Sequence, residues 1–137
     1  MFPLPSLICN IIGEFSFRGP SATQFLEWLT PSSLATLPSY SSTLSVLLNP
    51  HGGIIDDTMI TKHADDAYYV VTNAGTREKD LAWFQDKLAE WNASERAGKG
   101  PVDHEVLEHW GLVALQGTTL SLLSHAVLMA ALRPQIT

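Results

Sequence analysis

The stretch TLSVLLNPHGGIIDDTMIT, residues 43–61, holds two runs of strand-like residues on either side of a Pro-His-Gly-Gly sequence. In the first run, Leu44 and Val46 alternate with other residues and so share one face of a strand; IIDDTMIT forms the second strand. We expect both glycines to supply positive φ angles for a tight reversal. A phosphate-binding loop would need a following helix and a lysine, whereas a β-branched pair follows here. The stretch therefore predicts a β-hairpin.

Two adjacent carboxylates, Asp56 and Asp57, follow the turn on the second strand. Successive side chains of a strand point to opposite faces, so one aspartate meets solvent and the other faces whatever covers the sheet. Each also has apolar neighbours on its own face, and burial there raises a carboxyl pKa unless hydrogen bonds offset it. Alternation leaves two interpretations open: a surface aspartate that closes a hairpin, or a general base or ligand anchor.

The remaining chain predicts further strands and two helices. AYYVVT, residues 67–72, is a third strand that completes an antiparallel meander, and two short strands are expected near 102–106 and 112–115. Two segments have the apolar spacing of helices, SATQFLEWLT (21–30) and TREKDLAWFQDKLAEWN (76–92). In the first of them, Ser21 and Gln24 match a capping box. The pattern predicts the α+β class, with helices packed on an antiparallel sheet.

Composition limits the classes of function. The 137-residue chain has a formal net charge of -6 and no run of lysines or arginines, so nucleic-acid binding is not expected. A single cysteine, Cys9, excludes an internal disulfide. The five histidines share no ligand spacing with a carboxylate or with the cysteine, so no metal site is expected.

Both ends of the chain are apolar. We expect residues 1–16 to form a divergent leader without a secretory signal or an arginine-rich transit peptide, and residues 118–137 to form a divergent tail. The run TTLSLLSHAVLMAAL, residues 118–132, falls short of the roughly 20 residues that a membrane helix requires. No association with a membrane is expected.

Four stretches, in order and spacing, resemble the N-terminal part of the aminomethyltransferase of the glycine cleavage system, the T-protein, a member of a folate-binding family. They are FRGPSATQFLEWLTP, LSVLLNPHGGIIDDTMI, YYVVTNAGTREKDLAWFQDKL and WGLVALQG. The resemblance implies that residues 17–117 are a partial folate-binding domain and that the chain is an incomplete N-terminal portion of the T-protein fold. It further implies an enzyme that takes an aminomethyl group from the lipoyl arm of H-protein. Such an enzyme releases ammonia and passes the methylene unit to tetrahydrofolate.

The same resemblance implies roles for particular residues. The second aspartate of the GG-x-x-DD motif, Asp57, matches the catalytic carboxylate, which orients and helps to deprotonate the folate amine. Asn73 matches a position that contacts the pterin, and Leu44 and Val71 match positions that line the same pocket. Asp56 is left as a supporting or solvent-facing partner. The implied cofactor is tetrahydrofolate, the implied partner is lipoylated H-protein, and the eukaryotic family works in the mitochondrial matrix.

Two alternatives stay open. One is a non-catalytic folate-binding or interaction module, like the iron-sulfur assembly relatives that share the fold; their K-x-C-Y-x-G-Q-E type of motif is not found in this sequence. The other is an inactive fragment, since the later parts of the family, which supply a glutamate and arginines to the folate tail, are missing from it.

Overall fold

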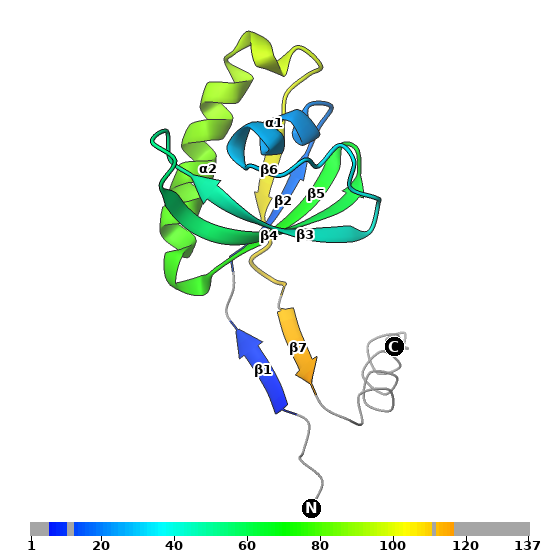
Figure 1. Ribbon diagram of the computed structural model, residues 1–137, viewed down its shortest axis with the longest axis vertical. Helices are drawn as coiled ribbons and strands as arrows, with labels where there is room; N and C mark the ends of the chain where they lie inside the picture. The colour runs from blue at the N-terminus through cyan, green and yellow to red at the C-terminus, as the bar shows by residue number, and fades with distance from the viewer. Residues whose placement is uncertain (1–5, 11–12, 111, 117–137) are drawn as a thin grey trace, which may run out of the picture. The chain divides into compact units, whose positions relative to one another are not determined.

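The computed structural model describes residues 6–10, 13–110 and 112–116 (Figure 1). It divides into two compact units, Ile11–Trp110 and a second formed by Met1–Asn10 with Gly111–Thr137. In the second unit, β1 (Ser6–Asn10) pairs antiparallel with β7 (Leu112–Gln116), which is the predicted strand near 112–115. The apolar run at 118–132 lies outside the described residues. The predicted boundaries at residues 16 and 117 stay a prediction.

The larger unit contains a five-stranded antiparallel sheet in the order β3-β4-β5-β2-β6. Its strands are β2 (Gly13–Arg18), β3 (Ser41–Leu48), β4 (Ile54–Ala64), β5 (Ala67–Thr72) and β6 (Asp103–Val106). The meander β3-β4-β5 and the strand β6 are confirmed. Strand β2 was not predicted from the sequence. It lies between β5 and β6 and pairs antiparallel with both of them over long sequence separations.

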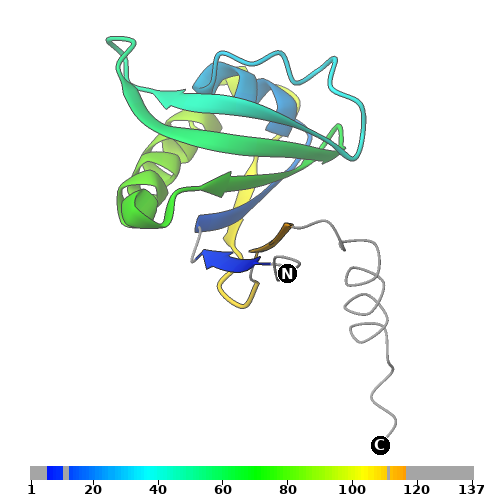
Figure 2. The same ribbon diagram turned by 60° about the horizontal axis from the view of Figure 1, so that its bottom comes forward.

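Two helices, α1 (Ala22–Leu29) and α2 (Arg77–Asn92), pack on the same face of this sheet (Figure 2). Short 3-10 helices, η1 (Ala74–Thr76) and η2 (Glu95–Ala97), flank α2. The ring of Phe84 on α2 lies 5.1 Å from those of Phe15 and Phe17 on β2 and meets both edge-on. All three rings are fully buried, and such aromatic burial dominates the energetics of a core. The α+β prediction is confirmed. Among the described residues, no helix is long and apolar enough to cross a membrane.

The predicted capping box at α1 is wrong. Ser21 is the N-cap residue, but its side chain makes no capping hydrogen bond. Its hydroxyl instead donates to the Gly100 carbonyl at 2.5 Å and accepts from the indole Nε1 of Trp91 at 3.1 Å. A buried indole N–H needs an acceptor, and this tertiary demand outweighs the local cap.

The turn between β3 and β4 needs only one positive φ angle, so the prediction for Gly53 is wrong. Gly52 has φ 80°, whereas Gly53 does not lie in that region. The side chain of Asn49 closes the turn, since its Oδ1 accepts from the backbone N–H groups of His51 and Gly53 at 2.9 and 3.0 Å. An asparagine side chain that bonds the backbone N–H two residues on mimics a backbone turn and so helps to close this one.

Candidate functional site

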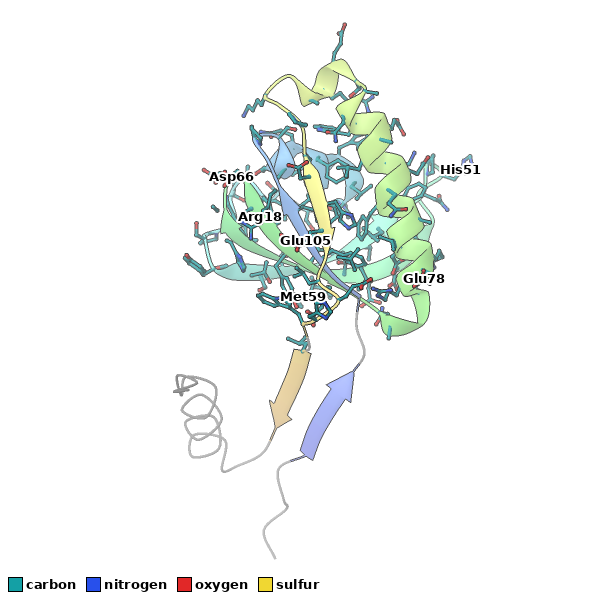
Figure 3. All side chains as sticks on the ribbon, turned by 180° about the vertical axis from the view of Figure 1, so that it is seen from behind. Arg18, His51, Met59, Asp66, Glu78 and Glu105 are labelled. Carbon is teal, nitrogen blue, oxygen red and sulfur yellow. The ribbon has the colours of Figure 1, made fainter. Side chains whose placement is uncertain are left out.

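The sheet face opposite the helices carries the predicted site residues. Strand register lines up one row of side chains across four strands, namely Leu44, Met59, Val71 and Glu14. Leu44 and Met59 are large apolar side chains that remain 67% and 41% exposed. Met59 lies on the side of the sheet away from α1 (Figure 3). Leu44, Met59 and Val71 of this row form an apolar strip on a face that the helices do not cover.

Asp57 and Asn73 lie beside this apolar strip. Asp57 lies two residues before Met59 on β4 and therefore shares its face, and it pairs with Val46 across to β3. Asn73 follows the end of β5, and its side-chain Nδ2 donates to Asp57 Oδ1 at 2.7 Å. Both residues are exposed. The fold thus brings all four predicted site residues, Leu44, Asp57, Val71 and Asn73, to one end of the open face.

Asp56 points the other way and is buried, so the alternative of a solvent-facing Asp56 is wrong. Its carboxylate accepts from the Asn73 backbone N–H at 3.2 Å, from Asn73 Nδ2 at 2.9 Å and from Thr76 Oγ1 at 2.6 Å. Burial opposes ionisation, but the hydrogen bonds from Thr76 and Asn73 outweigh it and lower the pKa of Asp56 to about 2. Asp56 is therefore an ionised support, fully occupied by donors.

Asp57 is free to meet a ligand. Its Oδ1 is held by Asn73, and its Oδ2 receives no hydrogen bond from the residues that the structure describes. A carboxylate with one oxygen held and one open can accept a proton or an N–H group from a molecule on that face. Alternation predicted the opposite orientations of the two aspartates; the packing of the helices decided which one is open.

An aromatic group borders the same face and was not predicted. Tyr69 of β5 lies near His63, with ring centroids 6.4 Å apart, and near Trp110, also at 6.4 Å. Burial raises the pKa of the Tyr69 phenol to about 12, and the charge and hydrogen bond of Glu14 add to the rise. In the sequence, the alternation of Tyr69 with Val71 indicates that Tyr69 lies on the same face of the strand. No sequence pattern indicated a place for Glu14 in the sheet, because Glu14 lies in the segment that was predicted to be a leader.

Metal ligands are not gathered in this site. Within the part of the chain that the structure describes, no group of three or more His, Cys, Asp or Glu side chains has the geometry to hold a metal ion.

Comparison with known proteins identifies relatives of this fold. A family model described as the GCVT N-terminal domain matches residues 9–131. The chain is 45% identical over 105 residues to the mitochondrial aminomethyltransferase of Saccharomyces cerevisiae, and the match covers 76% of this chain and 25% of that protein. It is also 45% identical over 104 residues to the probable mitochondrial aminomethyltransferase of Schizosaccharomyces pombe, with the same coverage.

A solved structure shares the fold. The crystal structure of the glycine cleavage system aminomethyltransferase T from Bartonella henselae superimposes with a TM-score of 0.75 at 29% identity. The match covers 90% of this chain and 32% of that one. This match to a part of the T-protein structure confirms the fold that the sequence resemblance implied. The chain spans about a quarter of the length of the sequence relatives that it matches.

Proposed function

The chain belongs to the GCVT N-terminal domain family, and from that premise we propose that it acts in aminomethyl transfer, with its open sheet face as the folate-binding side. The proposed reaction passes the methylene unit of an aminomethyl group on the lipoyl arm of H-protein to tetrahydrofolate and releases ammonia. The two fungal relatives are, by name, an aminomethyltransferase and a probable aminomethyltransferase. The match covers a quarter of the length of each of these relatives.

The observation that carries this proposal is the contrast between the two aspartates. Asp56 is occupied by donors, whereas Asp57 keeps one oxygen open on the sheet face. Tetrahydrofolate, when bound, supplies the amine that receives the one-carbon unit. We assign to Asp57 the tasks of orienting that amine and accepting its proton, because a carboxylate within hydrogen-bond reach of the nucleophile can act as its base.

The surrounding residues fit a flat heterocycle with polar edges. The apolar strip of Leu44, Met59 and Val71 offers a surface for a ring to lie on. Asn73 holds Asp57 through its Nδ2, which leaves its carbonyl oxygen to accept from a ligand N–H group. In this proposal Leu44 and Val71 line the pocket, Asn73 contacts the pterin, and Met59 is added to the set.

Partner and location follow from the same proposal. The aminomethyl donor is lipoylated H-protein, and the proposed location is the mitochondrial matrix, since the names of both fungal relatives describe those proteins as mitochondrial.

Titration calorimetry with tetrahydrofolate tests the proposal. The chain should give binding heat, and Asp57→Asn should abolish it or weaken it by at least about tenfold, a loss of about 1.4 kcal/mol. Asp66→Asn is the matched control, because Asp66 is an equally exposed aspartate that precedes β5 at the far end of that strand from Asn73. Folded protein without binding heat would refute the idea that this chain binds folate by itself.

A non-catalytic folate-binding module is the second candidate. The favouring observation is that the match covers only a quarter of the fungal relatives. The two candidates differ in one measurement: both predict binding of tetrahydrofolate, but only the transferase releases ammonia when aminomethyl-lipoyl H-protein is added.

A further inference from the structure

A third carboxyl group, that of Asp80, lies beneath the site and has no role in the proposed function. Asp80 is in the first turn of α2, and its exposed fraction is 0%. Neither of its oxygens has a hydrogen-bond partner of good geometry among the described residues. Two unpaired buried carboxylate oxygens carry a large desolvation cost, which a carboxylic acid avoids by donating its own proton.

The acceptor that the geometry offers for that proton is Asp56. Thr76 donates to Asp56 Oδ2 at 2.6 Å, and Asp80 follows Thr76 by one helical turn, which places Asp80 on the side of α2 that faces Asp56. A hydrogen bond between the two carboxyl groups requires one of them to be protonated, because two carboxylates are both acceptors. Burial raises the pKa of Asp80 to about 6, with a further rise from Asp56, while nearby hydroxyls of Thr72 and Thr76 oppose it. Since the pKa of Asp56 is lowered to about 2, the proton belongs to Asp80.

These contacts form a continuous path to the open face. Asp80 lies one helical turn after Thr76, and Thr76 donates to Asp56 at 2.6 Å. Asp56 accepts from Asn73 Nδ2 at 2.9 Å, and the same nitrogen donates to Asp57 Oδ1 at 2.7 Å. We propose that Asp80 is a positioning residue, whose protonated carboxyl fixes Asp56 and thereby holds the Asn73 amide against Asp57. The inference rests on the proposed function, which is what assigns Asp57 and Asn73 to the folate site.

Ionisation of Asp80 would place two negative charges side by side in a buried region, where repulsion is strong. Asp56 would then shift away from Asp80, and because Asp56 accepts both the backbone and the side-chain N–H of Asn73, that amide would shift with it. Protonated Asp80 therefore corresponds to the ordered site, and ionised Asp80 to a looser one.

The other described ionisable groups near the start of α2 have partners elsewhere and do not act on the Asp80 carboxyl. Lys79 donates to the Ile55 carbonyl, and Arg77 pairs with Glu78 and Glu108. From β6, His104 packs against the ring of Phe84, one turn farther along α2, with 6.1 Å between centroids. Burial lowers the pKa of His104. Of the described ionisable groups, Asp56 is the one that acts on the Asp80 carboxyl.

NMR of the uniformly ¹⁵N-labelled chain, without folate, tests this inference. The probe is the side-chain amide of Asn73, assigned by its loss in Asn73→Ser and followed as a function of pH. In the wild type its shift should titrate with a midpoint near the Asp80 pKa of about 6. In Asp80→Asn the amide nitrogen replaces the acid as donor to Asp56, so the Asn73 shift should stay at its low-pH value throughout.

Two controls distinguish a specific effect of Asp80 on the Asn73 amide from a general change in the structure of the chain. The side-chain amide of Asn92, which bonds the backbone of Val102 at 2.9 and 3.0 Å, should not titrate in any variant. Asp80→Leu keeps the branched shape, with a larger volume, but removes the donor, so its Asn73 shift should be independent of pH and displaced from the wild-type low-pH value. If Asp80→Leu does not fold, the comparison of the wild type with Asp80→Asn still decides.

A wild-type Asn73 amide that does not respond to pH would overturn the inference, and so would a response that persists unchanged in Asp80→Asn, since its source would then be a group other than Asp80. Because no folate is present, failure of this test leaves a tetrahydrofolate-binding result standing. Equally, a chain that binds no folate can still show the titration.

Discussion

The side-chain amide of Asn73 donates to Asp57, with 2.7 Å between Nδ2 and Oδ1, and the same nitrogen lies 2.9 Å from Oδ1 of Asp56. An asparagine amide has two N–H donors, so one group serves both carboxylates. It joins an exposed carboxylate on the open face to a buried one on the helix side. Through this amide, the interior of the fold sets the orientation of the exposed site.

Removal of this amide should destabilise the chain. Asn73→Ala leaves the two aspartates adjacent without their shared donor, and we expect a loss of about 1–3 kcal/mol in the free energy of unfolding. Asn73→Asp adds a third carboxylate and should cost more at neutral pH than Asn73→Ala. Urea unfolding followed by tryptophan fluorescence measures both; equal stability of Asn73→Ala and wild type would contradict the shared-donor role.

Replacing each of the two adjacent aspartates with asparagine should have different effects: the change at Asp56 should lower stability, and the change at Asp57 should remove binding. Asp56→Asn replaces an oxygen that accepts hydrogen bonds with an amide donor in a buried place, at a cost of about 1–3 kcal/mol. Asp57→Asn is exposed and should change stability by less than about 0.5 kcal/mol while removing tetrahydrofolate binding. Unfolding and calorimetry on the same pair of variants check this, and similar stability losses would argue against the division of roles.

The free energy of unfolding should also depend on pH, because the pKa values of the buried residues Asp56 and Asp80 are shifted in opposite directions. The folded pKa of Asp56 is lowered to about 2, so its contribution is present above the unfolded value of 3.8 and is lost as pH falls toward 2. The folded pKa of Asp80 is raised to about 6, so its contribution is full below 3.8 and is lost as pH rises through 6.

Asp80→Asn should remove the loss of stability that the ionisation of Asp80 causes as pH rises through 6. We expect the variant to be more stable than the wild type at pH 7, by on the order of 2 kcal/mol, and to show little difference near pH 4. Urea midpoints at the two pH values give the comparison. A stability gain that is the same at both would show that Asp80 does not titrate in this range.

A tertiary contact, not a helix cap, should explain the role of Ser21. Ser21→Ala leaves the Nε1 of Trp91 and the Gly100 carbonyl without this partner and should cost about 1–3 kcal/mol. In a double-mutant cycle with Trp91→Phe, part of that cost should disappear, because the indole donor is already absent. Fully additive losses would mean that Ser21 does not act through Trp91.

The apolar strip should contribute to folate affinity without contributing much to the fold. Met59→Gln places a polar group on the open face, and we expect tetrahydrofolate binding to weaken by about fivefold to tenfold, or about 1 kcal/mol. Ile54→Gln is the matched control, because Ile54 is exposed on β4 but lies on the alternate set of positions. Calorimetry that finds the two variants equally impaired would remove Met59 from the site.

The local elements were within reach of sequence reasoning because their signals are local. The alternation of residues 43–61 predicted the hairpin, and the apolar spacing of residues 76–92 predicted α2. Strand β2 was not predicted, although it occupies an inner position in the sheet. Its polar Glu14 and Ser16 are buried in a strand that pairs with β5 on one edge and β6 on the other, and pairing over such sequence separations leaves no trace in a short window.

The sequence by itself determined that Asp56 and Asp57 point to opposite faces, because side-chain direction in a strand has a period of two. Only the tertiary structure decided which of them is buried, because that depends on the face against which α1 and α2 pack. The same packing buries Asp80 of α2 on the side of the sheet that holds Asp56, twenty-four residues earlier in the chain. Long-range packing of apolar surface therefore settles which carboxylate can meet a ligand and which can only support it.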